Sequence, residues 1–274
     1  MTDPSPPRLL SIAGSDSGGG AGIQADLKAF ARCGAHGMTA ITAITAQSTV
    51  AVSGVYPVAP EAIVAQVRAV VDDIGVDGVK VGMLGGAETI AAVAEALDLV
   101  GDAPVVVDPV MVAESGATLL EPEAREALRT WILPRATVLT PNLPEARVLA
   151  GADEEAGPEE LARAVHALGP GAVVVTGGHG ERTTGRGDWI ADVFFDGTQL
   201  VEIPGDRYPG GASHGSGCTH SAALATGLAR GLAPLEAAEQ AREVAAAAVR
   251  DGLRGIGAGA GPVDVFGLAA RTRD

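Results

Sequence analysis

The chain of 274 residues is 47% hydrophobic, 3% aromatic and 19% charged, a composition that excludes intrinsic disorder. Its formal net charge of −15 argues against nucleic acid and anionic membranes as partners. The two cysteines, Cys33 and Cys218, lie far apart, so we expect no disulfide framework and a cytoplasmic location. The polar N-terminus lacks the apolar region of a signal peptide, and no apolar run reaches the length of a membrane span.

Short apolar strands and helices alternate along most of the chain. Residues 9–13 are typical of a buried strand, residues 14–22 of a glycine turn, and residues 23–33 of a helix with apolar side chains on one face. The pattern continues with strands expected at 38–46, 50–58, 78–82, 105–108, 137–140 and 172–176, and helices at 60–74, 88–100, 122–132, 144–150 and 158–168.

The last third of the chain changes character. Two β-rich runs within residues 189–203 flank Asp196-Gly197, a dipeptide typical of a hairpin turn. Helices are expected at 218–230 and 234–253, before a glycine-rich tail. Strands alternating with helices indicate an α/β fold with a mostly parallel sheet covered on both faces. Because no linker, charge block or repeat divides the chain, we expect one domain over residues 1–274.

The segment from residue 212 to residue 225 begins as a turn of small residues and becomes an alanine-rich helix. Gly215 and Gly217 allow backbone N–H groups to converge where the helix begins, an arrangement that favours an anion such as phosphate. The same place holds the Cys218 thiol, and a helix N-terminus favours the thiolate form. An ordinary glycine-rich loop before a core helix is the alternative interpretation.

Polar side chains and glycines follow several of the expected strands directly. In an open parallel sheet, ligands bind at the carboxyl ends of the strands, so these positions are expected to lie along one edge. They are Asp16, Gln47, Met83, Asp108, Asn142, Glu145, Gly177 and Gly178, with Cys218 at the start of a later helix. This shared location predicts a binding site there.

Two of these side chains, Asp108 and Glu145, could hold a hydrated Mg²⁺, which prefers oxygen ligands. Asp108 is also a plausible turn residue before Pro109, and Asn142 and Glu145 have the spacing of a helix-capping pair. The glycine turn at 18–22 fits the dinucleotide fingerprint only loosely, and no Walker phosphate loop is present. A Rossmann dehydrogenase and a Walker-type ATPase are therefore disfavoured.

Taken together, these segments resemble the ribokinase-like superfamily and, within it, the hydroxymethylpyrimidine/phosphomethylpyrimidine kinases of thiamin biosynthesis. They occur in the family's order over nearly the whole chain. The matching residues are 12–16, 19–28, 41–47, 81–84, 108–113, 115–116, 140–146, 177–179, 214–219 and 261–263. The resemblance implies a three-layer α/β/α sandwich with a small β lid element, and often a homodimer.

The resemblance also implies an activity. Such enzymes use ATP and Mg²⁺ to phosphorylate the hydroxymethyl group of 4-amino-5-hydroxymethyl-2-methylpyrimidine, and usually then convert the monophosphate to the diphosphate. By position, Gln47 would hydrogen-bond the aminopyrimidine. Its pocket would be lined by Gly14, Ala21, Thr45, Met83 and Val110, and Asp26 matches a polar substrate-binding position near that pocket.

The resemblance assigns the remaining site residues to the phosphates. Asp108 and Glu145 would hold Mg²⁺, while Asn142, Thr176 and Gly178 would lie on the nucleotide side. The backbone of Gly215, Ser216 and Gly217 would stabilise the transferred phosphoryl group. Cys218 occupies the position where the superfamily's sugar kinases carry a catalytic Asp and the pyrimidine kinases carry Cys.

The sequence departs from the family pattern at two charged positions. Glu114 stands where Lys is common, and Thr176 replaces a usual Lys, so positive charge near the phosphates is reduced. A pyridoxal or bifunctional vitamin kinase is one alternative, against which Gln47 favours an aminopyrimidine. A non-catalytic pyrimidine- or nucleotide-binding regulator is another, and the retained Asp108, Glu145 and Cys218 argue against it.

Overall fold

The computed structural model describes residues 5–177, 182–184, 187–208, 210 and 212–271, with only the backbone described at 182–184 and 187–189. The strands are β1 Arg8–Asp16, β2 His36–Gln47, β3 Val52–Pro57, β4 Gly78–Val81, β5 Val105–Val107, β6 Val138–Leu139, β7 Ala172–Val175, β8 Arg182–Thr184, β9 Gly187–Phe195 and β10 Leu200–Asp206. The α-helices are α1 Gly22–Arg32, α2 Pro60–Asp73, α3 Ala87–Leu97, α4 Arg125–Ala127, α5 Leu143–Ala150, α6 Pro158–His166, α7 Ser216–Ala229, α8 Pro234–Arg250 and α9 Leu268–Arg271.

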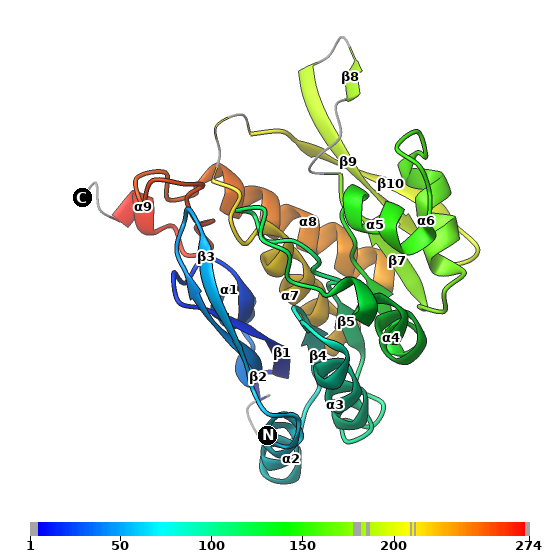
Figure 1. Cartoon of the computed structure of the whole chain (residues 1–274). Helices are drawn as coiled ribbons and strands as arrows, with labels where there is room; N and C mark the ends of the chain where they lie inside the picture. Colours follow the sequence, from blue (N-terminus) through cyan, green and yellow to red (C-terminus); the bar gives the residue numbers. More distant parts are fainter. Residues whose placement is uncertain (1–4, 178–181, 185–186, 209, 211, 272–274) are drawn as a thin grey trace.

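One sheet runs through the molecule in the order β10-β9-β7-β6-β5-β4-β1-β2-β3, and β8 pairs with β9 (Figure 1). The strands from β7 to β2 in this order are parallel, whereas β3, β8, β9 and β10 pair antiparallel with their neighbours. The predicted mostly parallel α/β sheet is therefore confirmed. The carboxyl ends of the parallel strands lie together along one edge.

Alternation along the strands places side chains in two apolar layers. Leu9 and Val106 face one layer, with α1, α7 and α8, while Leu10, Val105 and Val107 face the other, with α2, α3, α5 and α6. Helices thus cover both faces of the sheet, which gives the expected three-layer sandwich (Figure 1). With few aromatic residues, the core consists mainly of Ala, Val, Leu and Ile.

The predicted hairpin at Asp196-Gly197 is confirmed and joins β9 to β10. The Asp196 carboxylate accepts hydrogen bonds from the backbone N–H groups of Thr198 and Gln199, and Gly197 has a φ of 92°, which glycine adopts without strain. Strand β8 was not predicted. It extends the same antiparallel end of the sheet, as Figure 1 shows at the top of the view.

The helix expected over 122–132 is interrupted in the structure. The segment divides into a 3₁₀ turn at Pro122–Ala124, the short α4, a wide π turn at Leu128–Ile132 and a further 3₁₀ turn at Leu133–Arg135. Pro134 lacks an N–H and cannot continue a regular helix. Within the described ranges, no helix has the length and apolar character needed to cross a membrane.

Candidate active site

A cavity of about 590 Å³ lies at the carboxyl ends of the parallel strands. The structure brings most of the sequence-predicted site residues to its wall. They are Gly14, Ala21, Thr45, Gln47, Met83, Asp108, Val110, Asn142, Glu145, Thr176, Gly215, Ser216, Gly217 and Cys218. Gly178 lies outside the described residues, and Asp26 lies outside the cavity wall.

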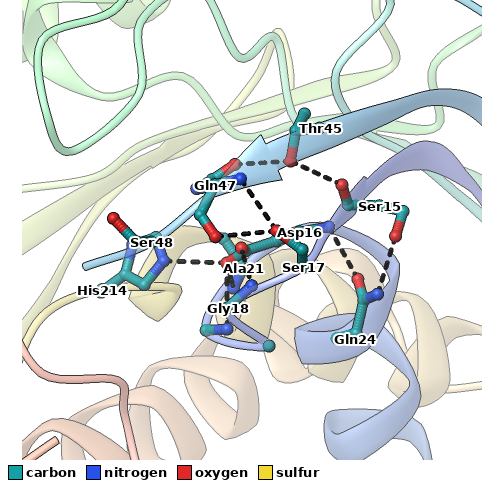
Figure 2. A network of polar contacts seen from close by, with 12 residues as sticks. Ser15, Asp16, Ser17, Gly18, Ala21, Gln24, Thr45, Gln47, Ser48 and His214 are labelled. Atoms are coloured by element: carbon teal, nitrogen blue, oxygen red, sulfur yellow. Dashed lines mark hydrogen bonds and ion pairs between the residues drawn. The ribbon is translucent and has the colours of Figure 1, made fainter. Parts of the chain in front are cut away.

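The glycine turn after β1 is organised by the carboxylate of Asp16. It accepts backbone hydrogen bonds from Gly18 at 2.7 Å, Gly20 at 3.0 Å and Ala21 at 2.8 Å, and its Oδ2 lies 3.0 Å from His214 Nε2 (Figure 2). Burial alone would raise the pKa of Asp16, but the hydrogen bonds from His214, Ala21 and Gly18 outweigh burial and lower it. Asp16 is therefore a charged anchor inside the turn.

Gln47, at the end of β2, is held against this turn. The Thr45 hydroxyl lies 3.0 Å from Gln47 Oε1 and 2.8 Å from the backbone oxygen of Ser15 (Figure 2). The Ser17 hydroxyl donates to the Gln47 carbonyl and accepts from the Gln47 N–H, both at 2.8 Å. These contacts hold the amide of Gln47 at the cavity wall.

The start of α7 also lines the cavity and lies directly beside the glycine turn. The N-cap residue Gly215 has a φ of 86°, and no side chain caps the helix. A Cβ on Gly215 would lie 1.8 Å from the carbonyl oxygen of Gly20, so only glycine fits at this approach. The helix begins at Ser216, two residues earlier than expected. Residues of its first turn line the cavity.

The structure corrects the expectation that Cys218 is a thiolate. Burial raises its pKa to about 12, further raised by the negative charges of Asp26 and Asp108 and opposed by Lys80 and a hydrogen bond from the Gly22 backbone. The helix N-terminus does not overcome the cost of burying a negative charge. Cys218 is a neutral thiol at neutral pH.

A buried ion pair between Asp26 and Lys80 lies beside the cavity and changes the interpretation of Asp26. Asp26 Oδ1 is 3.0 Å from Lys80 Nζ, and the Ser11 hydroxyl donates to Asp26 Oδ2 at 2.6 Å, with the charged side chains fully buried. Asp26 thus lies near the cavity, as expected, but it binds Lys80 and does not line the wall, which argues against its expected role in substrate binding. Its partner Lys80, from β4, does line the cavity.

Lys80 was missed by the sequence reasoning, although a lysine inside an apolar strand must find a buried partner. Burial alone would lower its pKa, but attraction to the carboxylates of Asp26 and Asp108 outweighs burial and raises it. Lys80 is therefore a positive charge facing the base of a cavity in an acidic protein.

Asp108 and Glu145 bring two carboxylates to the cavity beyond β5 and β6. Glu145 accepts backbone hydrogen bonds from Asn142 at 3.0 Å and Met111 at 3.3 Å, and Asn142 Oδ1 accepts from the Glu145 N–H at 2.9 Å. The capping interpretation of Asn142 and Glu145 is thereby confirmed. Burial and the nearby Asp108 raise the pKa of Glu145 to about 8, so the carboxyl is largely protonated near neutral pH.

A further polar cluster lines the cavity beside β9. His220 Nε2 lies 3.7 Å from Asp192 Oδ2, and Arg242 lies 3.5 Å from Asp192 Oδ1. The Gly177 N–H donates to the same carboxylate at 2.8 Å. His220, which the sequence motifs do not single out, is buried at the cavity wall, where burial lowers its pKa.

This architecture is that of a ribokinase-like phosphotransferase. The family model described as phosphomethylpyrimidine kinase matches residues 16–264. The hydroxymethylpyrimidine/phosphomethylpyrimidine kinase of Rhizobium meliloti is 49% identical over 261 residues, covering 94% of this chain and 96% of that protein. The chain belongs to the phosphomethylpyrimidine kinase family.

Solved structures agree with this assignment. The pyridoxal kinase of Staphylococcus aureus in complex with pyridoxal has a TM-score of 0.85 and 34% identity, over 97% of this chain and 95% of that chain. The phosphomethylpyrimidine kinase of Clostridium difficile has a TM-score of 0.74 and 37% identity, over 86% of this chain and 96% of that chain. The same fold thus occurs in two groups of vitamin kinases.

Proposed function

We propose that this protein transfers the γ-phosphoryl group of ATP to the hydroxymethyl group of 4-amino-5-hydroxymethyl-2-methylpyrimidine, and then phosphorylates the monophosphate. The observation that carries the proposal is the placement of Gln47 and the start of α7 on one cavity. The names of the relatives support the same substrate. The proposal also extends to the residue roles below.

Gln47 would recognise the aminopyrimidine. An amide side chain offers one acceptor and two donors in a plane, which suits the amino group and ring nitrogen of such a base. Met83 and Val110 supply apolar wall, and a Cβ on Gly14 would lie 2.9 Å from Met83 Cε. Gly14 therefore leaves room for the Met83 side chain in the wall of the cavity.

The start of α7 would stabilise the phosphoryl group during transfer. Backbone N–H groups of its first turn carry the positive end of the helix dipole, and no side chain caps them. Phosphoryl transfer is largely dissociative, so the acceptor hydroxyl needs positioning more than early deprotonation. The neutral Cys218 thiol would orient that hydroxyl by a hydrogen bond.

Asp108 and Glu145 fit Mg²⁺ as the companion of ATP. The raised pKa of Glu145 supports this assignment, because a bound cation would offset the repulsion between these two buried carboxylates. Among the described residues, no group of three or more His, Cys, Asp or Glu side chains could hold a metal ion. Mg²⁺ retains waters and takes few protein ligands, and when bound it would neutralise phosphate charge.

The Mg²⁺ proposal predicts a pH dependence. Below a pKa of about 8, Glu145 carries a proton that a cation must displace, so affinity for Mg²⁺ should fall up to about tenfold per pH unit below that value. Calorimetric titration of the nucleotide-free protein at pH 6.5, 7.5 and 8.5 measures this. Glu145→Gln should bind weakly with no slope, and an equal slope in that variant would contradict the assignment.

Gln47→Ala is expected to raise KM for the pyrimidine about 3- to 10-fold, because one to two hydrogen bonds of about 0.5–1.5 kcal/mol each are lost. The KM for ATP should stay within about twofold of the wild-type value. Gln47→Glu, of equal size but without the amide donors, should resemble Gln47→Ala. Steady-state kinetics with each substrate varied separates the effects, and a change confined to ATP would contradict the role.

Measurement of ADP release tests the function itself. Purified protein with Mg-ATP would be given hydroxymethylpyrimidine, its monophosphate, pyridoxal and ribose in parallel. Turnover on the pyrimidines is expected. No turnover on either one would refute the proposal, and turnover on pyridoxal alone would favour the vitamin-kinase alternative suggested by the Staphylococcus aureus structure.

We also propose a homodimer formed through β2 and β3. Ile44 and Tyr56, which pair across these strands, are exposed at 54% and 62% and leave an apolar surface at the β3 end of the sheet. Sedimentation equilibrium across micromolar concentrations tests it, and a monomer throughout would refute it.

A further inference from the structure

One side-chain pair joins two turns that are distant in the sequence. Asp16 belongs to the glycine turn after β1, and His214 precedes α7, yet Oδ2 and Nε2 lie 3.0 Å apart. Both side chains are buried, with exposed fractions of 2% and 9%. Figure 2 shows His214 directed at the carboxylate that organises the glycine turn.

The backbones of the two turns are also in direct contact. A Cβ added to Gly20 would lie 2.1 Å from His214 Cδ2, and one added to Gly215 would lie 1.8 Å from the Gly20 oxygen. The imidazole of His214 and the backbone of Gly215 therefore pack directly against the glycine turn. The start of α7 cannot shift relative to that turn without moving His214.

Each half of the pair is fixed to a further part of the site. The backbone of His214 is hydrogen-bonded to Gly261 at 3.3 Å and to Val263 at 3.1 Å, which holds it from the side of the C-terminal segment. The glycine turn is joined to Gln47 through Ser17 (Figure 2). The contacts thus continue from the backbone of Gln47, through the glycine turn, to the residues that precede α7.

We propose that Asp16 and His214 form a clasp that sets the distance between the acceptor bound at Gln47 and the phosphoryl-binding start of α7. The inference rests on the function proposed above and concerns positioning residues, which need not touch substrate. A misplacement of about 1 Å between reacting groups can lower the rate about a hundredfold while each substrate still binds. Loss of the clasp therefore lowers kcat far more than it raises either KM.

The test uses two substitutions of similar polarity but different reach. The amide nitrogen of His214→Gln lies near the former Nε2 and can restore the contact with Asp16, whereas that of His214→Asn lies near Nδ1 and cannot. We expect His214→Gln to keep kcat within about fivefold of wild type. His214→Asn is expected to lose about a hundredfold in kcat, with both KM values within about threefold.

Amide hydrogen exchange gives a readout that does not need turnover. In His214→Asn, peptides covering residues 14–22 and 213–219 should both exchange faster, and in His214→Gln both should stay protected. Equal kcat in the two variants, or a raised KM at unchanged kcat, would overturn the clasp. If the wild-type protein phosphorylates no pyrimidine, the proposed function fails, while joint protection of the two turns still tests their coupling.

Discussion

Replacing Cys218 by alanine is expected to lower kcat about a hundredfold and to leave the dissociation constant of the pyrimidine within about twofold of wild type. In the proposed mechanism the thiol at the start of α7 orients the hydroxyl and Gln47 holds the ring, so loss of the thiol should leave binding of the ring intact. Single-turnover kinetics with pre-bound pyrimidine, together with calorimetric binding, measure the two quantities separately.

Two further measurements define the role of the thiol. Because the pKa of Cys218 is about 12, Cys218→Ser should retain most of the activity by making the same hydrogen bond. A thiolate base would give a different result. Cys218→Ser would then be as impaired as Cys218→Ala, and kcat of the wild-type protein would rise about tenfold per pH unit. Cys33→Ala is the matched control, because Cys33 does not line the cavity, and it should keep wild-type activity. Wild-type activity in Cys218→Ala would exclude a role of the Cys218 thiol in catalysis.

Lys80→Met is expected to lower both activity and stability. It leaves Asp26 charged and unpaired at a fully buried position, which should lower the free energy of unfolding by about 3–5 kcal/mol. It also removes the positive charge that faces Cys218 and Asp108, so we expect kcat to fall about a hundredfold. Chemical denaturation and steady-state kinetics measure the two effects.

A double variant separates the two consequences. Asp26→Leu combined with Lys80→Met removes the unpaired charge and should recover most of the stability, because apolar replacements of buried ion pairs are often neutral. Activity should remain low. Recovery of activity with stability would show that Lys80 matters only for folding. Arg8→Met is the control, because its half-exposed pair with Asp77 should contribute about 0–1 kcal/mol.

Local sequence patterns predicted the elements and the edge of the sheet that carries the site. Strand ends in a parallel sheet converge by geometry, so Gln47, Asp108 and Glu145 could be placed on one cavity without coordinates. The hairpin at Asp196-Gly197 followed from turn chemistry alone. The broken helix at 122–132 shows the limit, because apolar periodicity does not specify how a proline terminates a helix.

Contacts between distant segments explain what the sequence could not provide. Asp26 and Lys80 are 54 positions apart and meet only after α1 packs beside β4. The same assembly partly buries Cys218, and the expected lowering of its pKa by the helix N-terminus was wrong, because burial raises it instead. His220 acquires its place at the cavity only through Asp192 on β9. Each miss concerns burial or charge pairing across the core rather than local conformation.

The close approach of Gly20 and Gly215 has a consequence for how the family can diversify. Neither position accepts a side chain, so the distance between acceptor and phosphoryl group cannot be adjusted there by substitution. The walls around the acceptor, including Met83 and Val110, carry no such restriction. New acceptors can therefore be accommodated by changing the walls while the transfer geometry is inherited intact, which suits a fold shared by kinases named for pyrimidines and for pyridoxal.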